Sequence, residues 1–355
     1  MIILKSPITM ESYLLDFLST RPVYGSNDTN MTQWKNDCLK EWTNIMETFL
    51  NSNIAIPKKE IWTIEQRKQN VLSLLSRPQI EQRTETWYME VKNMITASQF
   101  SLILKDNLTR GKLVLEKASG KMDTSNRKTV VHTIDLNPFT WGIRFEPIVK
   151  QIYCHLTKTE VKDMGRLKHQ TDPRLAASPD GMVINGSEEY YGRFVEFKAP
   201  VTRKIQNEVP KDYIVQMQIQ MEVGNVEECD YLEVKFNSAY ESKTPEMPTI
   251  SKYFGKIYII GKDNLPIRYE YSPLNTYDQE PILNENETII ETVPWTTSDF
   301  YLKTVERSKS WFSSIQHKID SFWKDVESAK AGTFVLPESS RKRKDTMCMI
   351  IDESK

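Results

Sequence analysis

The chain has 355 residues, which is long enough to bury a large core and to form two or three domains. Its net charge of −1 argues against a protein that coats nucleic acid non-specifically, although a chain with this net charge can still carry local basic patches. No run of about eighteen apolar residues occurs, so we expect no membrane-spanning helix. The four cysteines and four histidines are scattered, which argues against a zinc site or a disulfide framework and favours a reducing, intracellular compartment.

Residues 1–78 show apolar residues at helical spacing, and we interpret them as an accessory helical region. Beyond them, Thr84 or Thr86 is expected to cap a helix that carries Trp87. Thr96 or Ser98 is expected to cap the next helix. Free backbone N–H groups at such a helix start favour a phosphate, and plain capping is the alternative.

The segment from Thr140 to Leu156 is predicted to be a helix, because its apolar residues fall on one side. Glu146 falls beside that stripe rather than opposite it, so we expect its side chain to be partly exposed. Pro147 favours a kink or bulge next to it, because proline removes a hydrogen-bond donor and clashes one turn back. Glu146 is therefore a candidate functional carboxylate, and a rim glutamate without a catalytic role is the alternative.

Two short motifs carry the clearest chemistry: Ser-Pro-Asp-Gly at 178–181 and Val-Glu-Phe-Lys-Ala-Pro at 195–200. In an extended strand alternate side chains share a face, so Glu196 and Lys198 point the same way. If Asp180 ends the neighbouring strand, its carboxylate meets Glu196 near one point. Two carboxylates, completed by water and phosphate oxygens, are typical of a magnesium site.

Downstream, a helix is predicted from Tyr213 to about Val223, with Gln216 and Gln220 stacked one turn apart. These glutamines either orient water or phosphate at the site or are ordinary surface residues. Strands follow at 232–236 and 253–261, and the proline-rich stretch 262–297 is expected to be a loop-rich connector.

Ser298 is expected to cap a long C-terminal helix that closes near Gly332. The tail after Pro337 contains a run of four basic residues at 341–344. Such a run is typical of a nuclear localisation signal, of an arm that contacts DNA or of a solvated disordered tail.

The order helix, strand, turn, strand, helix is that of the PD-(D/E)xK nuclease core. The chain also resembles the lambda-phage exonuclease family, called the YqaJ-type viral recombinase nuclease family as well, over residues 80 to 265 or so. The matching motifs are Arg83-Thr84…Trp87, Ile95-Thr96-Ala97-Ser98, Trp141-Gly142…Glu146, Ser178-Pro179-Asp180-Gly181, Glu196-Phe197-Lys198 and Tyr213…Gln216-Met217-Gln218. The resemblance implies an α/β (α+β) fold with a restriction-endonuclease-like mixed central sheet flanked by helices, here with an extra helical N-terminal region.

The resemblance further implies a magnesium-dependent 5′-to-3′ exonuclease that digests linear double-stranded DNA, with Mn²⁺ able to replace Mg²⁺. The source it implies is a large DNA virus, and the process is viral DNA recombination, replication or repair. On this basis Asp180 and Glu196 hold the metal together with the backbone carbonyl of Phe197, and Glu146 acts through metal-bound water. Lys198 positions the attacking water. Gln216 contacts the nucleophile or the scissile phosphate.

The same resemblance places a pocket for a terminal 5′-phosphate at Thr96, Ser98 and Ser178, and gives Tyr213 a supporting role beside Gln216. The chain departs from the family at Val91, where the family has an arginine for that phosphate. The nearest cations in the sequence are Lys92 and Arg83. A lysine cannot reproduce the two-pronged hydrogen bonding of an arginine.

The implied partners are double-stranded DNA ends, a single-strand annealing protein and further copies of the chain in a ring, with no membrane. The implied location is the host cytoplasm or nucleus. We expect a helical accessory region (1–78), a nuclease core (79–265), a connector with a C-terminal helix packing on the core (266–336) and a basic disordered tail (337–355). Three alternatives stay open: an ordinary hairpin at 178–200, an inactive DNA-end-binding scaffold, and an endonuclease or RNA-degrading nuclease on the same core.

Overall fold

The computed structural model describes residues 62–80, 84–105, 108–120, 137–238 and 252–338, together with Lys40, which lies in a helix. The chain divides into two compact units, residues 1–61 and residues 62–355. The elements below all belong to the second unit. Among the residues that the structure describes, no helix combines the length and the apolar character needed to cross a bilayer.

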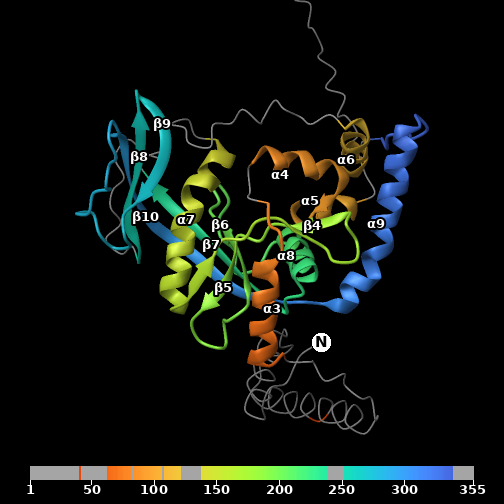
Figure 1. Ribbon diagram of the computed structural model, residues 1–355, viewed down its shortest axis with the longest axis horizontal. Helices are drawn as coiled ribbons and strands as arrows, with labels where there is room; N and C mark the ends of the chain where they lie inside the picture. Colours follow the sequence, from red (N-terminus) through yellow and green to blue (C-terminus); the bar gives the residue numbers. More distant parts are fainter. Residues whose placement is uncertain are drawn as a thin grey trace, which may run out of the picture. The chain divides into compact units, whose positions relative to one another are not determined.

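A mixed seven-stranded sheet forms the centre of this unit, in the order β2-β5-β6-β7-β10-β8-β9 (Figure 1). Only the β6–β7 pair of this sheet is parallel, and its other pairs are antiparallel. The strands are β2 (Glu160–Lys162), β5 (Gly181–Asn185), β6 (Phe194–Lys198), β7 (Glu228–Ser238), β8 (Phe254–Lys262), β9 (Leu265–Tyr271) and β10 (Thr288–Glu306).

A second, three-stranded sheet has the order β1-β4-β3 and lies among the upstream helices. Its strands are β1 (Ile95–Thr96), β3 (Leu167–Lys168) and β4 (Leu175–Ala177). The upstream helices are α4 (Glu85–Glu90), the 3-10 turn η1 (Val91–Asn93), α5 (Ala97–Ile103) and α6 (Leu108–Ser119). The strands of this small sheet contact α5 and also the downstream helix α8 (Lys211–Gly224). As expected, Thr84 caps α4: its hydroxyl accepts a hydrogen bond from the backbone N–H of Trp87 at 3.2 Å.

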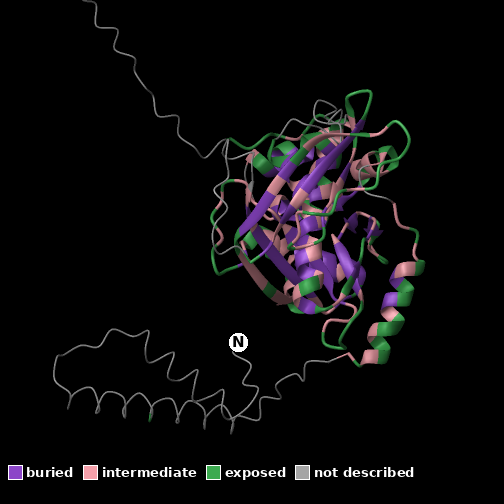
Figure 2. Ribbon diagram, turned by 90° about the vertical axis from the view of Figure 1, so that its left-hand side faces the viewer, coloured by how far each residue is buried: buried purple, intermediate pink, exposed green. Residues whose placement is uncertain are grey.

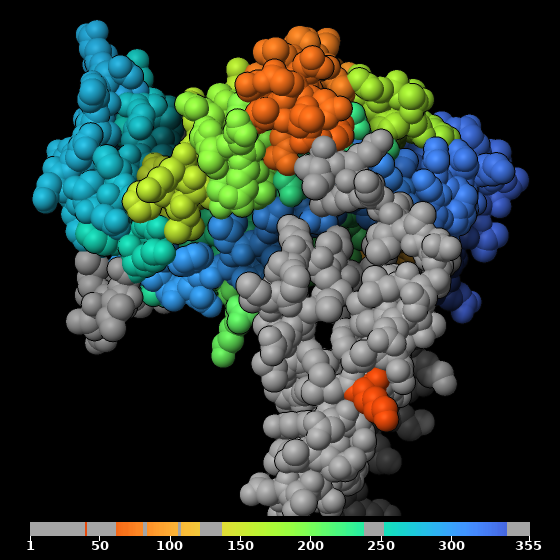
Figure 3. All heavy atoms as spheres, turned by 90° about the horizontal axis from the view of Figure 1, so that it is seen from below, coloured from red at the N-terminus to blue at the C-terminus, as the bar shows by residue number. Residues whose placement is uncertain are grey.

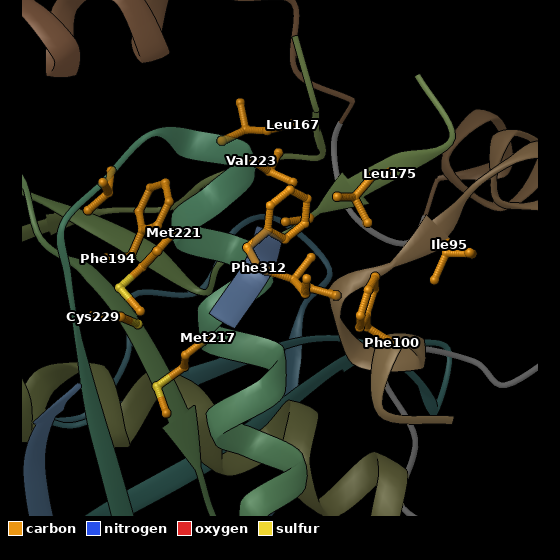
Figure 4. Close-up of a cluster of buried hydrophobic side chains, with 14 of the residues drawn as sticks. Ile95, Phe100, Leu167, Leu175, Phe194, Met217, Met221, Val223, Cys229 and Phe312 are labelled. Atoms are coloured by element: carbon orange, nitrogen blue, oxygen red, sulfur yellow. The ribbon is translucent and has the colours of Figure 1, made fainter. Parts of the chain in front are cut away.

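Helices α7 (Pro138–Thr157) and α8 (Lys211–Gly224) cover opposite faces of the central sheet. Helix α7 begins after Asn137, whose side chain accepts hydrogen bonds from two free backbone N–H groups. Because strand side chains alternate, β6 buries Val195 and Phe197 with α7 and Phe194 with α8. Figure 4 shows Phe194 beside Met217 and Met221 of α8, in the hydrophobic cluster between the sheet and this helix. Figure 2 shows that the strands of the sheet are largely buried.

The expected fold class, a mixed central sheet flanked by helices, is confirmed. The connector was predicted correctly only for residues 272–287, which form turns and loops. Residues 262–297 contain β9 and the first half of β10, a 19-residue strand that pairs with β8 and then with β7. Prolines suggested a loop there, but Pro294 sits within the β10 ladder opposite Lys256.

The C-terminal helix, α9 (Lys309–Lys330), begins later in the sequence than predicted. Ser298 lies within β10, next to its bulge, and the N-cap is Ser308, whose hydroxyl accepts from the backbone N–H of Trp311 at 3.2 Å. Helix α9 packs on α6 and contributes Phe312 and Phe322 to the core. The basic tail from 339 onward lies outside the described residues.

Helix α3 (Ile64–Ser76) packs into the core through Val71 and Leu74, so residues 62–78 are part of the core unit rather than of the accessory region expected for 1–78. The rest of that region lies outside the described residues except for Lys40. Arg67 of α3 donates hydrogen bonds to the backbone carbonyls of Glu188 and Glu189 in the β5–β6 turn. Figure 3 shows the orange α3 residues beside this yellow-green turn, so the 181–195 insert contacts α3.

Candidate active site

The two predicted motifs meet where β5 and β6 pair. Gly181 lies opposite Val195 in this antiparallel pair, which brings the preceding Asp180 beside Glu196. The Asp180 Oδ2 atom accepts a 2.7 Å hydrogen bond from the backbone N–H of Phe197. A Cβ atom at position 181 would lie 2.4 Å from Cγ1 of Val161, so only glycine fits after this aspartate.

Glu196 is fully buried, and protein groups bind both of its carboxylate oxygens. Its Oε1 atom accepts a hydrogen bond from Nε2 of Gln216 at 2.7 Å and also forms an ion pair with Lys198. Its Oε2 atom accepts from Nε2 of Gln220 at 2.6 Å. Both stacked glutamines therefore contact Glu196. Gln220 was the weaker candidate from sequence, although the same one-turn spacing that marked Gln216 also pointed to it.

The electrostatics of the site centre on Asp180. Burial raises the pKa of Asp180 well above its usual range, and the nearby carboxylates of Glu196 and Glu146 raise it further. For Lys198, burial opposes the charged form, but attraction to Glu196 and Asp180 is stronger in sum and raises the pKa above its usual value. Lys198 is therefore a cation in the working pH range of ordinary enzymes.

Glu146 reaches the same place from α7 and lines two adjoining pockets together with Phe197. One pocket, of about 570 Å³, is also lined by Asp180. The other, of about 210 Å³, is also lined by Lys198 and Tyr213. Glu146 is half-buried, as the sequence predicted. Glu146, Asp180 and Lys198 thus border open space that a phosphodiester could enter, whereas Glu196 is fully buried.

Tyr213 and Arg203 form the far wall of the smaller pocket. The Nζ atom of Lys198 lies 5.1 Å and the guanidinium carbon of Arg203 lies 5.7 Å from the centroid of the Tyr213 ring. Arg203 also pairs with the fully buried Glu233. Arg203 was not among the sequence candidates. Its position five residues after Lys198 offered no periodic signal, because the intervening residues form neither helix nor strand.

The hydroxyl residues proposed for a phosphate lie on the three-stranded sheet and the start of α5. The Thr96 and Ser98 hydroxyl oxygens are 3.1 Å apart, and Nε1 of Trp87 donates to Oγ of Ser178 at 3.4 Å. Lys92 lies in η1, and none of the hydrogen bonds or ion pairs found within the described ranges joins it to Ser98 or Ser178. The other expected cation, Arg83, lies outside the described residues.

A divalent cation fits the donor set at β5–β6. Within the described part of the chain, no group of three or more His, Cys, Asp or Glu side chains lies close enough to hold a metal ion. Magnesium, however, commonly takes one or two carboxylates and completes its shell with water and substrate phosphates. Asp180 and Glu196 supply hard oxygen donors, and the nearby carboxylate of Glu146 adds negative charge that a cation would balance.

Comparison with known proteins places this region in context. Residues 83–227 match the model of the YqaJ-like viral recombinase domain. An uncharacterised protein of Acanthamoeba polyphaga mimivirus is 24% identical over 309 residues, which cover 72% of this chain and 54% of that protein. The chain thus spans about half the length of this curated relative.

Two solved structures also resemble the chain. The alkaline exonuclease LHK-Exo from Laribacter hongkongensis is 19% identical, with a TM-score of 0.43, and the match covers 70% of this chain and 95% of that one. A phage related exonuclease from Haemophilus somnus is 11% identical, with a TM-score of 0.36, and the match covers 67% of this chain and 96% of that one.

Proposed function

We propose that the chain is a divalent-metal-dependent exonuclease that degrades one strand of linear double-stranded DNA from its 5′ end. The match of residues 83–227 to the model of the YqaJ-like viral recombinase domain supports this proposal. The observation that carries the proposal is the junction of β5 and β6, where Asp180, Glu196 and Lys198 gather beside two pockets. The process we propose is viral DNA recombination, replication or repair.

Asp180 and Glu196, with the carbonyl of Phe197, are the residues proposed to hold the cation, preferably Mg²⁺. When bound, such a cation supplies positive charge at the phosphate and lowers the pKa of water. Lys198 is a cation next to both carboxylates, so it can orient the attacking water or neutralise charge on the scissile phosphate. Glu146 faces the same space and can accept a hydrogen bond from that water.

Gln216 fixes the direction of Glu196 through its amide N–H, which leaves its own amide oxygen as an acceptor for the attacking water. Tyr213 supports this arrangement by presenting its ring to Lys198. These roles require water to approach from the pocket side, because Glu196 itself is fully buried.

The partners proposed with this activity are DNA ends, a single-strand annealing protein and further copies of the chain in a ring. The location proposed is the host cytoplasm or nucleus. These proposals rest on the family alone.

The test is incubation of the protein with Mg²⁺ and linear duplex DNA labelled at the 5′ or the 3′ end, beside covalently closed circles. We expect stepwise release of label from the 5′ end and no cleavage of circles. Asp180→Ala abolishes this release, whereas Asp278→Ala, in the exposed loop between β9 and β10, leaves it unchanged. Cleavage of circles would instead indicate an endonuclease, and binding without degradation by the intact protein would indicate a scaffold.

A further inference from the structure

Two cations border the smaller pocket of about 210 Å³, and the chemistry proposed above uses only one of them. Lys198, the last residue of β6, pairs with the fully buried Glu196. Arg203 pairs with Glu233 of β7, which is also fully buried and lies opposite Lys198 in the parallel register. Both cations lie within 5.7 Å of the centroid of the Tyr213 ring. Lys198 and Arg203 are therefore neighbours across a single pocket.

Arg203 can bind a ligand without releasing its carboxylate. Its side chain is 36% exposed, whereas that of Glu233 is 0% exposed. The pair uses the two terminal nitrogens of the guanidinium, Nη1 and Nη2. A guanidinium has five N–H donors, so this pair leaves others that an anion entering the pocket can accept. Because Glu233 already orients the arginine, binding an anion requires little further ordering of this long side chain.

The chain between the two cations is held in place from β7. The Nζ atom of Lys235 donates to the backbone carbonyls of Pro200 and Val201. Because side chains alternate along a strand, Lys235 and Glu233 lie on the same face of β7. These two residues hold the segment 199–203 at two points, so contacts inside the protein fix the wall of the pocket that carries Arg203.

Gly142 of helix α7 borders the same pocket, one turn before Glu146. A glycine inside a helix is less favourable than an alanine, because glycine loses more conformational freedom on folding. Packing does not require glycine here, since an added Cβ atom would have no tertiary neighbour within 4 Å among the described residues. The missing side chain instead keeps the pocket wide beside Glu146, which suits close approach of a ligand backbone.

We propose that this pocket binds the sugar–phosphate backbone of the cleaved strand. Arg203 holds the phosphodiester that follows the scissile one, and Gly142 leaves room for the backbone. Phosphates repeat along a strand, so a scissile phosphate at Lys198 is followed by another anion that a neighbouring cation can bind. The fork of an arginine suits a phosphate oxygen pair. The inference rests on the proposed function, because the scissile bond defines this phosphate as the second phosphodiester from the 5′ end.

The test removes the charge of one phosphate at a time and measures binding without turnover. Full-length protein in EDTA is titrated with a fluorescent hairpin duplex that has a single open end, and anisotropy gives the dissociation constant. A neutral methylphosphonate replaces either the second phosphodiester from the 5′ end or one far inside the duplex. We expect the wild type to lose about tenfold in affinity at the second position only, as for one hydrogen bond between charged groups.

Arg203→Gln should bind the unmodified duplex about tenfold more weakly and lose less than twofold from the methylphosphonate at the second position. The matched control is Lys204→Gln, which removes the charge of the next residue, an exposed lysine outside the pocket. This control should keep the tenfold loss at the second position. Two results would overturn the inference: a wild type that tolerates the neutral group at that position, or an Arg203→Gln variant that loses as much from it as the wild type does.

A second variant covers the case in which Arg203→Gln fails to fold because Glu233 is left without its cation. Gly142→Leu fills the pocket with a residue that favours helices and meets open space. We expect its melting temperature to equal or exceed that of the wild type, and its affinity for the unmodified duplex to fall at least fivefold. A Gly142→Leu protein that binds DNA as tightly as the wild type would contradict the proposal.

These measurements separate the pocket from the nuclease activity, because they need neither metal nor cleavage. A protein that degrades no DNA but loses affinity at the second phosphodiester through Arg203 would support the pocket and refute the proposed function. An active nuclease whose binding ignores that phosphate would refute the pocket alone.

Discussion

The Nε2 atom of Gln220 donates a 2.6 Å hydrogen bond to Oε2 of Glu196, and both side chains are fully buried. This contact fixes the carboxylate from the side opposite to Lys198 and Gln216, which both bind Oε1. Glu196 is thus held in one orientation before any substrate arrives, as preorganised catalysis requires.

Gln220→Ala should lower the turnover of linear DNA more than tenfold with little change in DNA affinity, because one carboxylate oxygen loses its donor. The loss of a donor to a buried charged oxygen should also lower the free energy of unfolding by ~1–3 kcal/mol. The matched control is Gln218→Ala. Gln218 is also buried, and it bonds the backbone at Glu306 and Ser308, away from the site. We expect both variants to be destabilised to a similar extent, and only Gln220→Ala to lose turnover. Equal turnover in the two would contradict it.

Lys198→Ala should leave DNA binding largely intact and remove turnover, because we propose that Lys198 acts at the scissile phosphate or the attacking water. The Glu196 carboxylate then keeps only its two glutamine donors, so the free energy of unfolding should fall by ~1–3 kcal/mol. Gel-shift affinity and single-turnover cleavage, measured at a temperature where the variant is folded, separate the two effects. A parallel loss of affinity and turnover would refute the role assigned to this lysine.

Divalent cations should raise the melting temperature of the wild-type protein and should have no effect on Asp180→Asn. Without cations, Asp180→Asn should be at least as stable as the wild type near pH 7, because burial and two neighbouring carboxylates disfavour the charge of Asp180. Differential scanning fluorimetry with EDTA, Mg²⁺ or Ca²⁺ checks both statements. A cation-dependent shift that persists in Asp180→Asn would place the metal elsewhere.

Lys117 should make the free energy of unfolding rise between about pH 8 and pH 10.5. Burial lowers its pKa in the folded state from 10.5 to about 8, so across this window the unfolded chain binds more protons than the folded one. Burying the charged Lys117 lowers the free energy of unfolding by ~3 kcal/mol, at 1.36 kcal/mol per pKa unit. This destabilisation is fully present below pH 8 and disappears above pH 10.5.

Urea unfolding at pH 7.5, 9 and 10 measures this slope. Lys117→Met should lack it, and the difference between the two proteins isolates Lys117 from other groups that titrate in the same range. The same slope in both proteins would mean that Lys117 keeps its ordinary pKa when folded.

The local sequence pattern was enough to predict which side chains share a face along β6 and along α8. Alternation along a strand placed Glu196 and Lys198 on one side, and one-turn spacing placed Gln216 above Gln220. Local pattern misplaced the start of the last helix, because a serine beside the bulge of β10 resembles a helix cap. The proline at 294 likewise suggested a loop, since sequence does not show which strand would pair with it.

The sequence by itself determined which carboxylates, lysine and glutamine are candidates for a phosphodiesterase site, and on which face of its strand or helix each side chain points. Those properties depend on residue type and on neighbours a few positions away. Only the tertiary structure decided that Trp87 meets Arg166 and Ser178. Trp87 lies 79 residues from Arg166 and 91 residues from Ser178 in the sequence. Contacts over such separations depend on how the two sheets pack, and no local period encodes them.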